Sequence, residues 1–133
     1  MKKKSIIKLG FIILLLFFIG KSSYWYIRNN NNNINIRIAN YSQFEDSVNI
    51  KMYWDEKMLY NGVLKKKDWY KFFSFNCSLG KHTLKIVSPK STEIKQLYVL
   101  PIKFIAIEYY GQSQTLTDDF FTVTTSSSLI KIE

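Results

Sequence analysis

The feature that most limits the possible folds is an uncharged apolar run near the N-terminus. Residues 9–20 read LGFIILLLFFIG, and Lys2, Lys3, Lys4 and Lys8 precede them. Apolar surface of this extent must be covered, and a basic start followed by an apolar block is typical of segments that enter a membrane. We therefore expect residues 1–28 to be a signal peptide or an N-terminal membrane anchor rather than a buried helix of a soluble domain.

Two membrane interpretations of this segment remain open. Gly20-Lys21-Ser22 places small residues where a cleavage site needs them, which predicts a secreted protein cut after Ser22. Alternatively, residues 6–27 are long enough to cross a bilayer. The aromatic cluster at residues 24–26 would then lie at the outer interface, and this cluster favours the anchor. The lysines before the run place the N-terminus in the cytoplasm and the following domain outside the cytoplasmic membrane.

The remaining composition narrows the classes of function. The formal charge is +9, but six of the 19 basic residues lie within residues 1–28, which contain no acid. The rest of the chain is mildly basic, and we expect no nucleic-acid partner. A single cysteine and a single histidine exclude a disulfide framework and most metal sites, so we expect no metal and no cofactor. Wide use of Lys, Asn and Ile matches AT-rich codons and indicates a bacterium.

After an asparagine run at residues 29–33, interpreted as a spacer, the apolar pattern changes to period two, which is typical of half-buried strands. The pattern and its turns predict a single Ig-like antiparallel β-sandwich of seven or eight strands over residues 34–133, with a small barrel as the alternative. Asp55-Glu56-Lys57 is the expected hairpin turn, and Asn61-Gly62 the expected bulge or bend. Strands are expected at residues 34–38, 48–54, 58–64, 69–77, 82–87, 93–100, 102–110 and 120–125, with another candidate at 129–132.

One segment carries a family resemblance. Leu79-Gly80-Lys81-His82-Thr83-Leu84 resembles a hairpin of bacterial extracytoplasmic Ig-like and PEGA-like β-sandwich modules, where it follows a strand and turn like Tyr53-Trp54-Asp55-Glu56-Lys57. The likeness extends over residues 48–87. It implies a sandwich outside the cytoplasm that binds a partner or acts as a spacer, and it implies no catalytic chemistry.

Few residues of the chain are suited to catalysis or metal binding. Cys77 and His82 are close enough across the predicted hairpin to be neighbours, but no oxyanion hole or orienting acceptor can be named for them. We expect both to pack, and we expect no enzymatic activity. The paired acids at residues 45–46 and 118–119 lack calcium-loop spacing and are interpreted as solvated turn residues. Residues 65–67 are three lysines in a solvated loop.

Exposed aromatic side chains are the remaining candidate site. Tyr and Trp bind partners with little loss of entropy, although strands and small cores also favour them. In two adjacent strand positions, such as Tyr109 and Tyr110, at least one side chain points outward. We expect an envelope module that acts through protein contacts, as an accessory or an inhibitor- or immunity-type binder, or alternatively binds glycans or cell wall. The candidate contact residues are Trp54, Trp69, Tyr70, Tyr98, Tyr109 and Tyr110.

Overall fold

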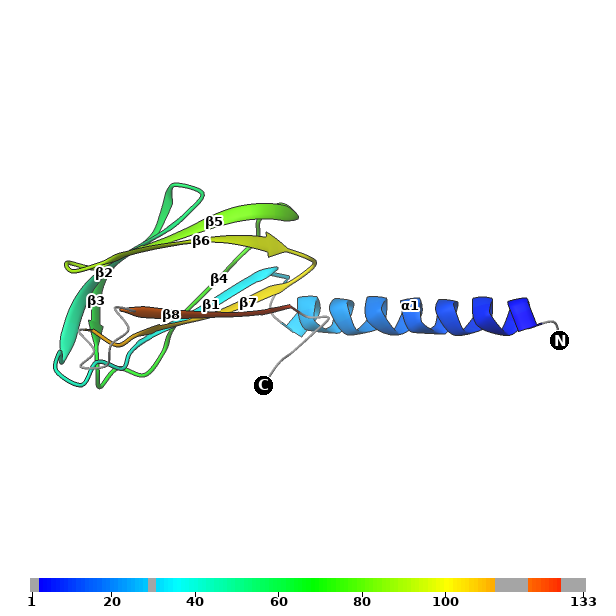
Figure 1. Ribbon diagram of the computed structural model, residues 1–133, viewed down its shortest axis with the longest axis horizontal. Helices are drawn as coiled ribbons and strands as arrows, with labels where there is room; N and C mark the ends of the chain where they lie inside the picture. The colour runs from blue at the N-terminus through cyan, green and yellow to red at the C-terminus, as the bar shows by residue number, and fades with distance from the viewer. Residues whose placement is uncertain (1–2, 29–30, 112–119, 128–133) are drawn as a thin grey trace.

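The computed structural model describes residues 3–28, 31–111 and 120–127. A single long helix projects from one end of a sandwich of two β-sheets (Figure 1). The predicted β-sandwich with an N-terminal apolar helix is therefore confirmed. The elements are α1 (Lys3–Arg28), β1 (Ile34–Asn40), β2 (Ser47–Trp54), β3 (Lys57–Lys65), β4 (Lys71–Phe75), β5 (Gly80–Val87), β6 (Thr92–Val99), β7 (Lys103–Tyr109) and β8 (Phe121–Ser127).

The two sheets have the strand orders β4-β1-β7-β8 and β3-β2-β5-β6. Among the described strands, all pairings are antiparallel except that of β1 with β7, which is parallel, with Ile34 opposite Lys103 and Ile38 opposite Ile107. The prediction of a purely antiparallel sandwich is wrong at this pair. Two parallel neighbouring strands need a long connection between them. Between β1 and β7 this connection contains β4 and all four strands of the other sheet. Residues 118–119 and 129–132, for which turn and strand predictions were made, lie outside the described residues.

The core lies between the sheets and follows the period-two pattern. On β1 the side chains of Ile34, Ile36 and Ile38 are at most 1% exposed, while Arg37 between them faces solvent. The facing sheet contributes the alternating apolar positions of β2 and β5. Alternate side chains of a strand point to opposite faces, so these positions meet in one layer. The core also contains Val48, Ile50, Met52, Trp54, Leu64, Leu84, Ile86, Leu97, Val99, Ile105, Ile107, Tyr109 and Phe121.

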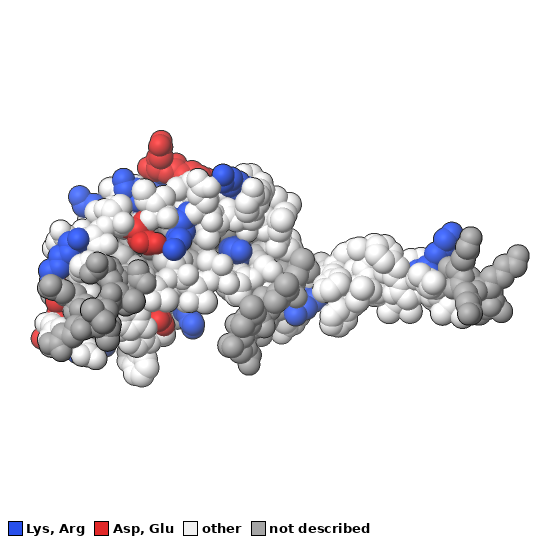
Figure 2. Space-filling model, in the orientation of Figure 1, with Lys and Arg blue, Asp and Glu red and all other residues white. Residues whose placement is uncertain are grey.

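Helix α1 has an apolar surface that the sandwich leaves uncovered. Its segment Ile6–Tyr24 is long and apolar enough to cross a membrane, and none of it is buried. Figure 2 shows this helix without charge along its middle, with basic side chains only towards its two ends. A helix of 26 residues extends about 39 Å, more than the roughly 30 Å of a bilayer's hydrocarbon core. Helix α1 also runs unbroken through Ser22, where cleavage was considered.

The connection between β2 and β3 confirms one predicted turn and corrects another. Asp55 and Glu56 join the strands as a two-residue hairpin turn, and both have positive φ values, 47° and 68°. Asn61 and Gly62 form neither a bulge nor a bend, because they pair regularly within β3. The irregularity lies next to Leu59, where the register shifts. Because the chain already reverses at Asp55 and Glu56, β3 continues through Asn61-Gly62 as a regular strand and no second turn forms there.

Asn33, the last residue of the asparagine run, is attached to the sandwich. Its backbone N–H donates to Asn76 Oδ1, its side-chain amide donates to the carbonyl of Cys77, and its Oδ1 accepts from the N–H of Cys77. The backbone N–H of Lys103 donates to its carbonyl as well. The start of β1, the β4–β5 loop and the start of β7 are therefore held together close to α1.

Candidate functional site

The outer faces of the two sheets differ in charge. The outer face of β3-β2-β5-β6 carries four lysines, at positions 51, 65, 81 and 85, and no acid among its described strand residues; we call it the lysine face. The outer face of β4-β1-β7-β8, called here the β1/β7 face, carries Arg37 and Glu108 as its only charged side chains within the described strands. Charge-poor surfaces with aromatic residues and arginine are typical of protein interfaces.

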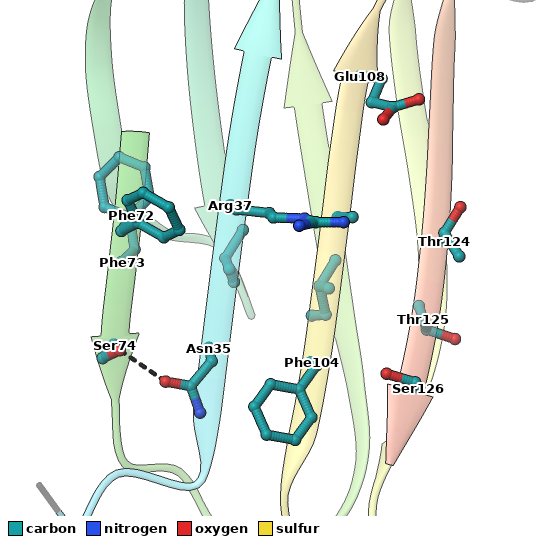
Figure 3. A pocket seen from close by; sticks show the side chains of 13 residues that line it. Asn35, Arg37, Phe72, Phe73, Ser74, Phe104, Glu108, Thr124, Thr125 and Ser126 are labelled. Atoms are coloured by element: carbon teal, nitrogen blue, oxygen red, sulfur yellow. Dashed lines mark hydrogen bonds between the residues drawn. The ribbon is translucent and has the colours of Figure 1, made fainter. Parts of the chain in front are cut away.

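The β1/β7 face is hollowed into a groove of about 720 Å³. Figure 3 shows Arg37 extending from β1 across β7, with Phe72 on one side of it and the hydroxyl side chains of β8 on the other. The groove has room at its centre because Ala106 is paired with both Arg37 and Thr124 and has only a methyl side chain. Its outward-pointing lining residues are Asn35, Arg37, Phe72, Ser74, Phe104, Glu108, Thr124 and Ser126.

The charged groups of the groove are held in place by aromatic neighbours. The guanidinium of Arg37 lies 4.9 Å from the centre of the Tyr70 ring, and in the described chain it makes no ion pair. The hydroxyl of Tyr110 donates to Glu108 Oε2 over 2.6 Å. This hydrogen bond is the main reason why the pKa of Tyr110 is raised, to about 12, with burial and the Glu108 charge contributing further. Arg37 therefore presents a positive charge that a ligand can pair with.

Three tyrosines gather at the end of this face that lies away from α1. The hydroxyls of Tyr41 and Tyr70 are 2.6 Å apart, and the ring of Tyr41 stacks on that of Tyr110 with centroids 6.1 Å apart. These residues come from the end of β1, the approach to β4 and the end of β7, so only the folded sheet brings them together. We call Tyr41, Tyr70 and Tyr110 the tyrosine cluster, and it adjoins the groove through Arg37 and Glu108.

The six predicted contact residues do not form one surface. Tyr70 and Tyr110 belong to the tyrosine cluster, and Trp69, next to Tyr70 in the chain, is 88% exposed. Tyr98 is exposed on the lysine face. Sequence reasoning missed Tyr41, Arg37 and Phe72. The position of Arg37 between buried isoleucines was a readable signal, but the aromatic run at 69–77 gave no indication of which of its side chains point outward.

The structure corrects the prediction that Trp54 and Tyr109 are contact residues, because both side chains are buried in the core. Trp54 follows Ile50 and Met52 on the inward positions of β2 and packs edge-on against Phe75. Tyr109 is fully buried, whereas its neighbour Tyr110 is 40% exposed, as the alternation of a strand requires. The Tyr109 hydroxyl donates to Glu45 Oε2 over 2.7 Å, and Lys90 Nζ donates to the other oxygen of that carboxylate.

His82 is buried and has an acceptor at each ring nitrogen. Nδ1 lies 2.5 Å from Asp55 Oδ2, Nε2 lies 2.7 Å from the Ser78 carbonyl oxygen, and the ring stacks on Trp54. Burial lowers the pKa of His82, but the hydrogen bonds to Asp55 and Ser78, together with the Asp55 charge, outweigh it and raise the pKa above its usual value. When the ring is protonated, both nitrogens donate and neither has a lone pair with which to act as a base.

Cys77 is oriented towards the same carbonyl and is not activated. Its Sγ donates to the Ser78 oxygen over 3.3 Å. Burial is the main cause that raises the pKa of the thiol, and the negative charge of Asp55 adds to it, so the reactive thiolate is disfavoured. Among the described residues, no group of three or more His, Cys, Asp or Glu side chains is placed to hold a metal ion.

No protein-family model, curated protein or solved structure matches this chain. The resemblance of residues 48–87 to Ig-like and PEGA-like modules therefore stays a prediction.

Proposed function

We propose that this protein is a membrane-anchored module of a bacterial envelope that binds another protein through its β1/β7 face. The single observation that carries the proposal is the combination of an uncovered apolar helix with a sandwich whose two outer faces differ in charge. The N-terminus lies in the cytoplasm and the sandwich outside the cytoplasmic membrane. In this role the module has no catalytic activity of its own and acts as an accessory of an envelope complex or as an inhibitor- or immunity-type binder.

Helix α1 supports the anchor. The apolar span Ile6–Tyr24 has 19 residues, about the length that a helix needs to cross the hydrocarbon core, and its two lysines, Lys8 and Lys21, lie near its ends. Its side chains find no cover in the sandwich, so a bilayer is the environment that removes them from water. The intact mass of the protein in membrane and soluble fractions tests this. Full length in the membrane is expected, whereas a soluble protein lacking residues 1–22 would show that the helix is a cleaved signal.

The composition of the β1/β7 face supports a protein partner. Binding hot spots are enriched in tyrosine and arginine, and both lie together here at the end of the sheet. The ring of Phe72, on the outer face of β4, is 73% exposed. A bound partner would remove this large apolar surface from water. By contrast, the lysine face presents the flexible, well-hydrated side chains that are depleted from interfaces.

A matched pair of positions tests which face binds. Phe72 and Ile94 each lie on the outer face of an edge strand, are 73% and 58% exposed, and are replaced one at a time by a photo-reactive residue. Site-specific photo-crosslinking in intact cells from position 72 should yield a defined protein adduct, and position 94 should yield none. Adding Tyr110→Ser should weaken the adduct from position 72. The same adducts from both positions, or none from either, would contradict the proposal.

The groove favours glycan as the second candidate. Phe72 and Phe104 supply apolar ring surface, and Asn35, Ser74 and Thr124 supply hydrogen-bonding groups of the kind that sugars need. Saturable binding to isolated cell-wall polysaccharide would favour this candidate if Phe72→Lys abolished it and Ile94→Lys left it intact. Protein adducts from position 72 without polysaccharide binding would favour the first.

A further inference from the structure

Large apolar side chains are exposed at the end of the sandwich from which α1 leaves. Leu79, in the loop between β4 and β5, is 61% exposed, and Leu100, in the loop between β6 and β7, is 53% exposed. We call these two loops, residues 76–79 and 100–102, the base. Figure 1 shows the ends of the strands that they connect facing α1.

The base and the last turns of α1 line the same hollow. A hollow of about 480 Å³ is lined by Ser22, Ser23 and Ile27 of the helix and by Leu79 and Pro101 of the base. Asn33 and Ile102 complete this lining. The chain between helix and sandwich is short and ends at Asn33, whose hydrogen bonds hold the β4–β5 loop and the start of β7. The sandwich is therefore not suspended on a long tether.

From this arrangement we infer that the base sits in the interfacial layer of the same membrane that holds α1. The inference rests on the proposed anchor. The apolar span ends at Tyr24, and Ile27 is three residues further, about 4.5 Å along the helix axis. The headgroup region extends about 5–7 Å beyond the hydrocarbon core on each side. Ser22 and Ser23, just before the end of the span, line the same hollow as Ile27, so the loops that share it lie at the boundary between the hydrocarbon core and the headgroups.

The chemistry of the base fits a lipid interface better than water or a second protein. Leu79 and Leu100 can insert side chains at the acyl boundary without exposing charge. Lys81 and Lys103 follow the two loops at the starts of β5 and β7, where their ammonium groups can meet anionic headgroups. A protein partner at this place would have to compete with the bilayer that surrounds α1.

The consequence is a defined orientation of the binding face. Strand β1 runs from Ile34, beside α1, to Asn40 at the other end, a length of roughly 20 Å. The tyrosine cluster follows at that far end, beyond the headgroups, where a partner outside the membrane can reach it. The base thus orients the β1/β7 face instead of leaving the sandwich to tumble above the membrane.

Depth-dependent fluorescence quenching tests the inference on the full-length chain. The protein is reconstituted into phosphatidylcholine–phosphatidylglycerol vesicles in a Cys77→Ser background. Single cysteines at Leu79, Leu100 or Phe44 carry a small fluorophore. Phe44 is the matched control, because it is an exposed apolar residue, 64% exposed, in the β1–β2 loop at the opposite end.

Nitroxide lipids labelled at the headgroup or upper acyl chain should quench positions 79 and 100 severalfold more strongly than position 44. Flotation of the protein with the vesicles reports the anchor separately, so a chain that fails to float contradicts the proposed function. If the chain floats but quenching is equal at all positions, the base does not sit in the membrane and the inference is overturned.

Discussion

At the scale of single residues, the pair of acceptors around His82 favours the protonated form of its ring. A neutral imidazole has one N–H and can donate to Asp55 or to the Ser78 carbonyl, whereas the imidazolium donates to both. The folded protein therefore binds the proton of His82 more tightly than the unfolded chain. A group whose pKa is raised by folding contributes stability below its unfolded pKa, near 6.5, and this contribution is lost as the pH rises through the folded pKa.

We predict that the chain's single histidine titrates above 6.5 in an NMR experiment and that unfolding becomes easier as the pH rises from 6 through this pKa. His82→Gln should lower the free energy of unfolding by about 1–2 kcal/mol at pH 6, because at least one charged hydrogen bond is lost. The variant should also show a flatter pH dependence over this range. A measured pKa at or below 6.5 would refute the assignment.

At the scale of elements, the turn between β2 and β3 has a strained backbone conformation that contacts with the neighbouring strand hold in place. Asp55 and Glu56 both occupy the left-handed region, which is unfavourable for residues with a Cβ. Asp55 is nevertheless tied to the next strand: its Oδ1 accepts the backbone N–H of Thr83, and its Oδ2 contacts His82. Its pKa is lowered by these contacts, although burial, the largest single influence, acts to raise it. No such hydrogen bond is found for Glu56 in the described chain.

The two turn positions should therefore respond oppositely to glycine. Glu56→Gly relieves the left-handed conformation and should stabilise the sandwich by about 1 kcal/mol. Asp55→Gly relieves the same conformation but removes the contacts to His82 and Thr83. It should be net destabilising by roughly 1 kcal/mol, since Asp55 is half exposed and its interactions are partly screened. Chemical denaturation of both variants measures this. Equal stabilisation by both would show that the Asp55 contacts contribute nothing.

At the scale of the whole molecule, the helix and the sandwich depend little on each other for folding. The core is built from strands of the two sheets alone, and none of the apolar span of α1 is buried. We predict that a chain starting at residue 29 stays folded and soluble without detergent, with a free energy of unfolding within about 1 kcal/mol of the sandwich in the full-length protein. Circular dichroism and denaturation test this. Aggregation of the shortened chain would show that α1 covers part of the sandwich.

The sequence by itself determined which stretches become helix and strand and which side chains of most strands face inward. The apolar run at residues 9–20 specified α1, and the alternation of isoleucines in β1 specified its buried face, because both signals lie within one element. The turn at Asp55 and Glu56 was readable for the same reason.

Only the tertiary structure decided the parallel pairing of β1 with β7 and the burial of Tyr109 beside an exposed Tyr110. Where both faces of a strand are apolar, alternation separates the two sets of side chains but does not say which set is covered. That choice depends on contacts between residues far apart in the chain. For the same physical reason the tyrosine cluster, which joins the ends of β1 and β7 to the start of β4, exists only in the folded sheet.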